Sequence, residues 1–136
     1  MAFRTTSGNA LPGRANAFTL IELLVVFAIL ATLLTLAVPR YFASVDRSKE
    51  AVLKQNLATL RNALDQFHSD TGKYPESLED LVKKRYLRSV PLDPITERTD
   101  SWVPQPPPAD SGLSGIYDVR SGAEGKGADG SDYASW

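Results

Sequence analysis

An apolar run of 21 residues, from Phe18 to Val38, constrains this chain more than any other feature, and it contains only one charged side chain, Glu22. A helix rises about 1.5 Å per residue, so the run would be roughly 30 Å long, the thickness of a bilayer's hydrocarbon core. The run therefore predicts a transmembrane helix. A carboxylate costs roughly 2.5 kcal/mol or more at mid-membrane, so Glu22 needs either a place near the membrane face or a partner of opposite charge.

A cleaved secretory signal peptide is the first alternative for this run. Such peptides have an apolar core of roughly 7–15 residues that ends in a small-residue cleavage site. Here the run is longer, the segment LAVPRYF offers no such site, and an amphipathic pattern follows directly. A retained anchor is the favoured interpretation. The residues before the run are polar and contain Arg4 and Arg14 but no acid.

Beyond the run, apolar side chains recur at steps of three and four residues, which indicates a helix with one buried face. We predict one long helix from Phe18 to Ser69, kinked or locally lost at Pro39 and ended by Gly72 and Pro75. The apolar positions of its second half are Phe42, Val45, Val52, Leu53, Leu57, Leu60, Leu64 and Phe67.

The rest of the chain is short of regular elements. The segment PESLEDLVKKRYL predicts a short helix capped by Ser77 and Asp80, and short strands are expected at 101–103 and within GIYDVRS. The chain has no cysteine, one histidine and a net charge of −1. Disulfides, thiolate metal sites, two-histidine metal sites and a basic face for nucleic acid are therefore excluded.

A cut between Ala17 and Phe18 would give Glu22 a partner. The new α-amino group at Phe18 would lie four residues from Glu22, on the same helical face. In an assembly, the carboxylate of one subunit could pair with the amine of the next, which offsets the desolvation of both charges. Because Glu22 is only the fifth residue of the run, a position at the membrane face stays an alternative.

The heptapeptide A-F-T-L-I-E-L resembles the prepilin cleavage and methylation signal of type IV pilins and type II secretion pseudopilins. The resemblance implies a cleaved leader 1–17, N-methylation of Phe18, and assembly roles for Glu22 and Pro39. The family usually has Gly before the cut, where this chain has Ala17.

Three further segments are similar to G-type major pseudopilins: FHSDTGKYPESLEDLV, VPLDPI and YDVRSGAEGKGADGSDY. The resemblance implies an α+β, pilin-like fold in which a long N-terminal helix packs on a small head with a short helix and a small sheet. It implies three parts: the leader 1–17, the transmembrane and filament-core helix 18–38, and an amphipathic helix with a periplasmic head, 39–136. PITERTDSW and PQPPPAD are less similar to these subunits.

The same resemblance implies a calcium site in the acidic C-terminal loop. Calcium takes 6–8 oxygen ligands in flexible geometry. The expected ligands are Glu124, Asp129 and Asp132, with Ser121 and Ser131 as further candidates. The alternative is a solvated acidic tail that binds no ion.

By resemblance, the chain is a non-enzymatic pseudopilus subunit of a type II secretion system, anchored by one span in the bacterial inner membrane. Its expected partners are its own copies, other pseudopilins, the prepilin peptidase and methylase, and the inner-membrane assembly platform. A type IV or competence pilus subunit is the alternative, and a hydrolase using His68 beside Asp70 is a third. The basic cluster Lys83–Arg85 could contact a partner or lipid, or be a solvated face. Trp102 and Trp136 could be interface anchors or core residues.

Overall fold

The computed structural model describes residues 2–4, 8–9 and 16–136. Most of the predicted leader 1–17, Arg14 included, lies outside the described residues. The chain divides into two compact units, Met1–Pro39 and Arg40–Trp136, and each is described by itself.

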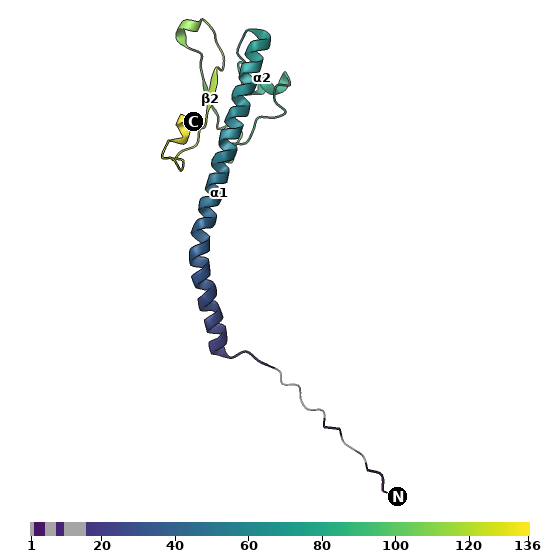
Figure 1. The fold of residues 1–136 in the computed structure, drawn as a ribbon. Helices are drawn as coiled ribbons and strands as arrows, with labels where there is room; N and C mark the ends of the chain where they lie inside the picture. The colour runs from purple at the N-terminus through teal and green to yellow at the C-terminus, as the bar shows by residue number, and fades with distance from the viewer. Residues whose placement is uncertain (1, 5–7, 10–15) are drawn as a thin grey trace. The chain divides into compact units, whose positions relative to one another are not determined.

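Helix α1 spans Leu20–Thr71, 52 residues that contribute to both units (Figure 1). Both of its ends lie two residues later than the sequence predicts. It stays helical through Pro39, so the predicted local loss of helix there is wrong. In the first unit every residue from Leu20 onward is exposed, and by length and composition this stretch is apolar enough to cross a membrane.

In the second unit, α1 is amphipathic and buries one stripe. The buried apolar positions follow steps of four and three residues, which places them on one face. Phe42 and Val52, predicted to belong to that face, are exposed instead. Val52 precedes the buried Leu53 by one residue, which turns it about 100° around the helix and away from the core. The buried apolar stripe consists of Leu53, Leu57, Leu60, Ala63, Leu64 and Phe67.

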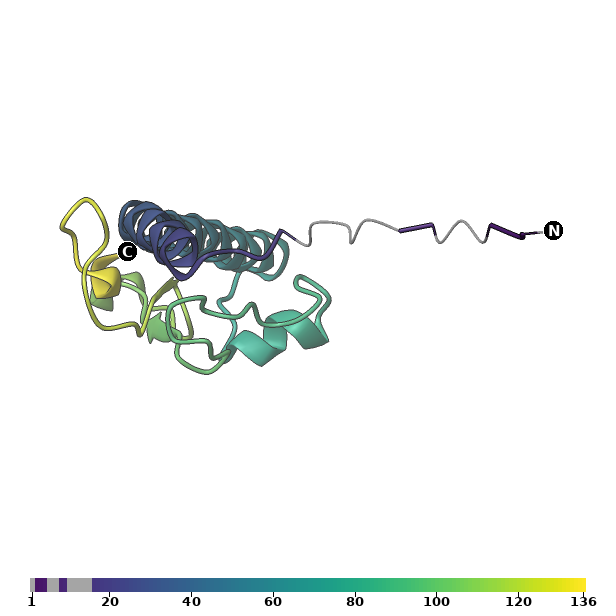
Figure 2. The ribbon, with the colours of Figure 1, turned by 90° about the horizontal axis from the view of Figure 1, so that it is seen from below.

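The rest of the second unit gathers on one side of this half of α1 (Figure 2). Helix α2 covers Leu78–Lys83, and strands β1, Val103–Gln105, and β2, Asp118–Arg120, pair antiparallel with Val103 opposite Arg120. Two short 3₁₀ turns complete it, η1 at Ala109–Ser111 and η2 at Tyr133–Ser135. The predicted α+β fold class, with a long helix, a short helix and a small sheet, is confirmed.

Local bonds explain where α2 begins and ends. At its start, the Asp80 carboxylate accepts the backbone N–H groups of Glu76 and Ser77, at 3.2 and 3.3 Å. At its end, Tyr86 N–H donates to the carbonyl of Leu81, and Arg85 N–H donates to that of Val82. This is a Schellman ending, in which Arg85 takes the left-handed φ of 66° that glycine usually supplies.

Candidate functional site

The predicted cleavage site lies just before α1. Ala17 and Phe18 precede the first helical residue, Leu20, and both are exposed. Phe18 keeps 85 % of its surface accessible. A peptide bond in non-helical, exposed backbone can enter a protease active site without unwinding a helix, so the Ala17–Phe18 bond is sterically available.

Glu22 forms a reciprocal cap with Thr19 at the start of α1. Its Oε2 atom accepts the Thr19 backbone N–H at 3.2 Å and the Thr19 hydroxyl at 3.3 Å. In return, the Glu22 backbone N–H donates to Thr19 Oγ1 at 3.2 Å. A capping box satisfies N–H groups that a helix start leaves unpaired. This role was not predicted, although Thr followed three residues later by Glu is its signal in the sequence.

The Glu22 cap uses one oxygen of the carboxylate. Within residues 16–136, the hydrogen bonds to this side chain all end on Oε2. Oε1 is therefore free for a donor from outside the chain. The cap also fixes the carboxylate at the first turn of α1, where the helix dipole favours negative charge.

The C-terminal loop does not bring the three predicted calcium ligands together. Among the described residues, no group of three or more acidic, histidine or cysteine side chains is close enough to hold an ion. Asp129 Oδ1 accepts the Ser131 backbone N–H at 3.0 Å and its hydroxyl at 2.6 Å, and these bonds lower the pKa of Asp129. Asp132 lies in a bridge opposite Lys126, and Glu124 is exposed.

Ser121, a further candidate ligand, is buried and hydrogen-bonded elsewhere. Its hydroxyl donates to Asp93 Oδ2 at 2.6 Å and accepts the Ala123 N–H at 3.1 Å. Asp93 is itself fully buried, and its Oδ1 accepts the backbone N–H of Ile95 at 2.8 Å. These bonds satisfy a buried carboxylate and tie the 93–98 turn to the segment after β2.

Glu50 on α1 holds the C-terminal loop, a contact that was not predicted from the sequence. Glu50 Oε1 accepts the Ala128 N–H at 2.9 Å and the Tyr133 hydroxyl at 3.1 Å. Burial and, next, the bond to Glu50 raise the pKa of Tyr133. These partners are 78 and 83 residues apart in the chain, so no local signal could reveal them.

His68 does not form the dyad of the hydrolase alternative. Its ring stacks on Tyr74, with centroids 4.2 Å apart and planes at 6°. Within residues 16–136, Asp70 accepts hydrogen bonds from Gln66 and Tyr86, and none from His68. The buried Nδ1 atom of His68 has no hydrogen-bond partner there either.

Of the two tryptophans, Trp102 is a core residue and Trp136 is half-buried. Trp102 is buried and donates its indole N–H to the Pro91 carbonyl at 2.8 Å. Trp136 contacts Tyr133 edge-on and lies under the Lys54 ammonium, 4.6 Å from the ring centre. The side chains of Lys83–Arg85 are all exposed.

Comparison with known proteins distinguishes a secretion pseudopilin from the alternative, a type IV or competence pilus subunit. The Prokaryotic N-terminal methylation motif matches residues 13–38, and the family Type II secretion system (T2SS), protein G matches residues 40–135. This chain belongs to the type II secretion system protein G family. It is therefore a type II secretion pseudopilin, and the match favours secretion over the pilus alternative.

Curated relatives agree with this family. The chain is similar to Type II secretion system core protein G of Pseudomonas aeruginosa, with 33 % identity over 141 residues, covering 89 % of this chain and 94 % of the relative. The Xanthomonas campestris pv. campestris protein of the same name is 33 % identical over 67 % of each chain. That of Escherichia coli K12 is 27 % identical over 90 % of this chain and 92 % of its own. No solved structure matches the chain significantly.

Membership of the protein G family indicates how the chain is processed, what it associates with and where it is located. The methylation motif implies processing by a prepilin peptidase, and the family implies association with other pseudopilins. The apolar first part of α1 fits an inner-membrane anchor with a periplasm-facing head. The family is structural rather than enzymatic.

Proposed function

We propose that the chain is cut between Ala17 and Phe18, N-methylated at Phe18, and assembled with its own copies into a periplasmic pseudopilus that drives folded proteins across the outer membrane. The first part of α1 anchors the precursor in the inner membrane with the head in the periplasm. Within the pseudopilus, the same apolar surface packs on that of other subunits. The assembly platform and other pseudopilins are its partners in this process.

The observation that carries this proposal is the state of Glu22. Its Oε2 atom caps the chain's own helix through Thr19, while Oε1 remains free within the described residues. The amine released at Phe18 of a neighbouring copy could bind Oε1 without breaking the cap. Such a pair would offset the cost of holding both charges among apolar helices.

The first experiment is mass spectrometry of the mature protein from secreting cells. We expect a chain that begins with N-methylated Phe18. The matched variant Ala17→Gly restores the family's usual residue before the cut and should be processed at the same bond. A mature protein that begins at any other residue would contradict the proposed processing.

A second experiment separates the charge of Glu22 from its cap. Glu22→Gln keeps a carbonyl oxygen that can cap Thr19 but removes the charge. We expect fewer pseudopili and loss of secretion with normal processing. The control Thr32→Ala removes a hydroxyl from the same apolar stretch, where it bonds only the Ala28 carbonyl, and should assemble normally. Normal secretion by Glu22→Gln would exclude the charge pair.

Calcium binding by the C-terminal loop is the second part of the proposal. The donor chemistry is suitable, because Glu124, Asp129, Asp132 and Ser131 supply oxygens in one short segment. The carboxylates do not converge in the structure, and Ser121 is bonded to Asp93, so an ion would need the loop to rearrange. Calcium should raise the thermal midpoint, and Asp129→Ala should abolish the rise. Identical melting curves in calcium and chelator would refute the site.

A further inference from the structure

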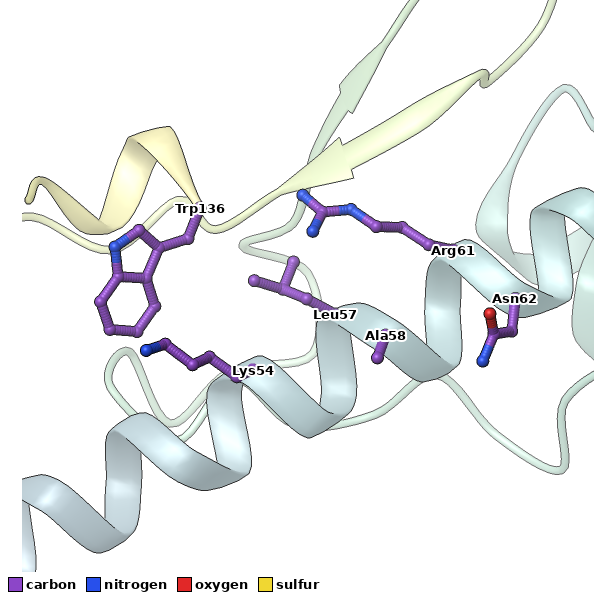
Figure 3. Close-up of a pocket in the computed structure, with 6 residues that line it drawn as sticks. All are labelled: Lys54, Leu57, Ala58, Arg61, Asn62 and Trp136. Carbon is purple, nitrogen blue, oxygen red and sulfur yellow. The ribbon is translucent and has the colours of Figure 1, made fainter.

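A groove runs between the middle of α1 and the C-terminal residue of the chain. It has a volume of about 470 Å³, and Lys54 and Leu57 point from α1 toward the Trp136 ring across it (Figure 3). Its floor and walls are mostly apolar, and its rim is cationic. All of its lining residues lie in the second unit: Lys54, Leu57, Ala58, Arg61, Asn62 and Trp136.

The two cations on the rim differ in what they can still bind. Arg61 donates to Asp118 Oδ1 at 2.8 Å and to the Val119 carbonyl at 3.0 Å, so its charge is already matched. Lys54 forms no ion pair within residues 16–136 and rests over the Trp136 ring. The groove therefore offers an apolar floor beside one cation with unused donors.

A complementary surface exists on the same chain, in the loop 106–115. Leu113 is 40 % exposed there, and Asp110 is the only charged side chain of the loop. Hydrogen bonds within the loop hold its backbone in one conformation. The Ser111 N–H and hydroxyl both donate to the Pro108 carbonyl, and Ser111 Oγ accepts the Leu113 N–H. A pre-organised apolar tip beside one acid suits an apolar groove beside one cation, because little ordering entropy is lost on binding.

The loop cannot fill the groove of its own chain, because its base is fixed at the far end of α1. Ile116 N–H donates to the Pro75 carbonyl at 2.8 Å, and Pro75 follows the last helical residue, Thr71. The groove is centred near Ala58, 13 residues before Thr71, which is about 20 Å along the helix. A second copy displaced along α1 would bring the two surfaces together.

We infer that the groove binds the 106–115 loop of a second copy, with Leu113 on the apolar floor and Asp110 at Lys54. The inference rests on the proposed pseudopilus function. Groove and loop are different surfaces, so the contact is heterologous: each copy offers its own loop to the next groove. A contact of this kind propagates along a filament instead of closing a dimer.

Cross-linking in sheared pseudopili tests the inference directly. The chain has no cysteine, so every cross-link reports the introduced positions. We expect Ala58→Cys combined with Leu113→Cys to give a ladder of multimers with a short bis-maleimide. The control combines Leu113→Cys with Thr59→Cys, an exposed neighbour about 100° around the helix, and should give no ladder. Abundant pseudopili without a 58–113 cross-link would overturn the inference.

Charge exchange gives an independent readout. Lys54→Glu and Asp110→Lys should each reduce the yield of pseudopili about fivefold, because each places like charges in contact. The double variant should restore the yield. If both single variants assemble like the parent, or if the double variant adds the two losses, the contact is absent. A parent strain that makes no pseudopili would instead refute the proposed function, and the inference with it.

Discussion

The two units of this chain satisfy their side chains in opposite ways. In the first, apolar residues are exposed all around the helix, with Ile21 71 % and Leu36 67 % accessible. In the second, the same helix buries Leu53 and Leu64 completely beneath its own head. The first unit therefore needs apolar surroundings to cover these side chains, whereas the second covers its own apolar stripe. One helix thus carries both an exposed apolar surface and the buried stripe of the head.

Truncating one leucine in each unit should give the largest contrast. Leu60→Ala leaves a cavity in the core and should destabilise the head by about 2–5 kcal/mol. Leu30→Ala removes the same atoms from an exposed position and should leave the head's stability within about 0.5 kcal/mol. Denaturant unfolding of the full chain in detergent, followed by tryptophan fluorescence, measures both. Equal losses would show that the first unit also supports the head.

Removing an acid from each unit should give the next largest contrast. Glu50→Ala frees the Ala128 N–H and the Tyr133 hydroxyl, and should cost the head about 1–2 kcal/mol. The matched change Glu22→Ala should affect assembly and leave the head's midpoint unchanged. The neighbouring Lys49→Ala is the control for altering α1 at this turn. Hydrogen exchange should show faster opening at Ala128 in Glu50→Ala alone.

The contrast between the units also explains what the sequence could predict. Periodicity located α1 within two residues at each end, because the pattern of apolar side chains is local. The strand expected at 101–103 is found at Val103–Gln105. Its limits are set by pairing with β2 rather than by the strand propensity of its residues. Ile116 and Tyr117, good strand formers, lie at the base of the loop instead.

The candidate site divides in the same way. The residues Ala17, Phe18 and Glu22 lie in one short motif, so the sequence alone was enough to predict their roles, which stay a prediction. The bonds of Asp93 to Ser121 and of Glu50 to Tyr133 join distant segments, and only the folded chain reveals them. The predicted calcium ligands were near in sequence but do not converge. Proximity along a glycine-rich loop does not determine the direction of its side chains.

The second unit holds two side chains in a costly backbone conformation, Arg85 and Glu97, and Arg85 is the one that ends α2. Its φ of 66° is unfavourable for any side chain and free of cost for glycine. Arg85→Gly should therefore stabilise the head by about 0.5–1 kcal/mol. The control Lys84→Gly, at φ −85°, should destabilise it by a similar amount. A loss of stability in Arg85→Gly would mean that the arginine side chain contributes more than its backbone costs.

Acid unfolding should give the smallest effect, confined to the second unit. The bonds from Ser131 lower the pKa of Asp129 below its ordinary value of 3.8. The stability contributed by this carboxylate is thus fully present above the unfolded-state pKa and is lost as the pH falls through the folded-state pKa. In Asp129→Asn, the melting temperature should fall less steeply below about pH 4. The control Asp110→Asn changes an exposed acid of the 106–115 loop and should retain the parent's profile. If the melting temperature of Asp129→Asn falls as steeply at low pH as that of the parent, the Ser131 bonds do not persist in solution.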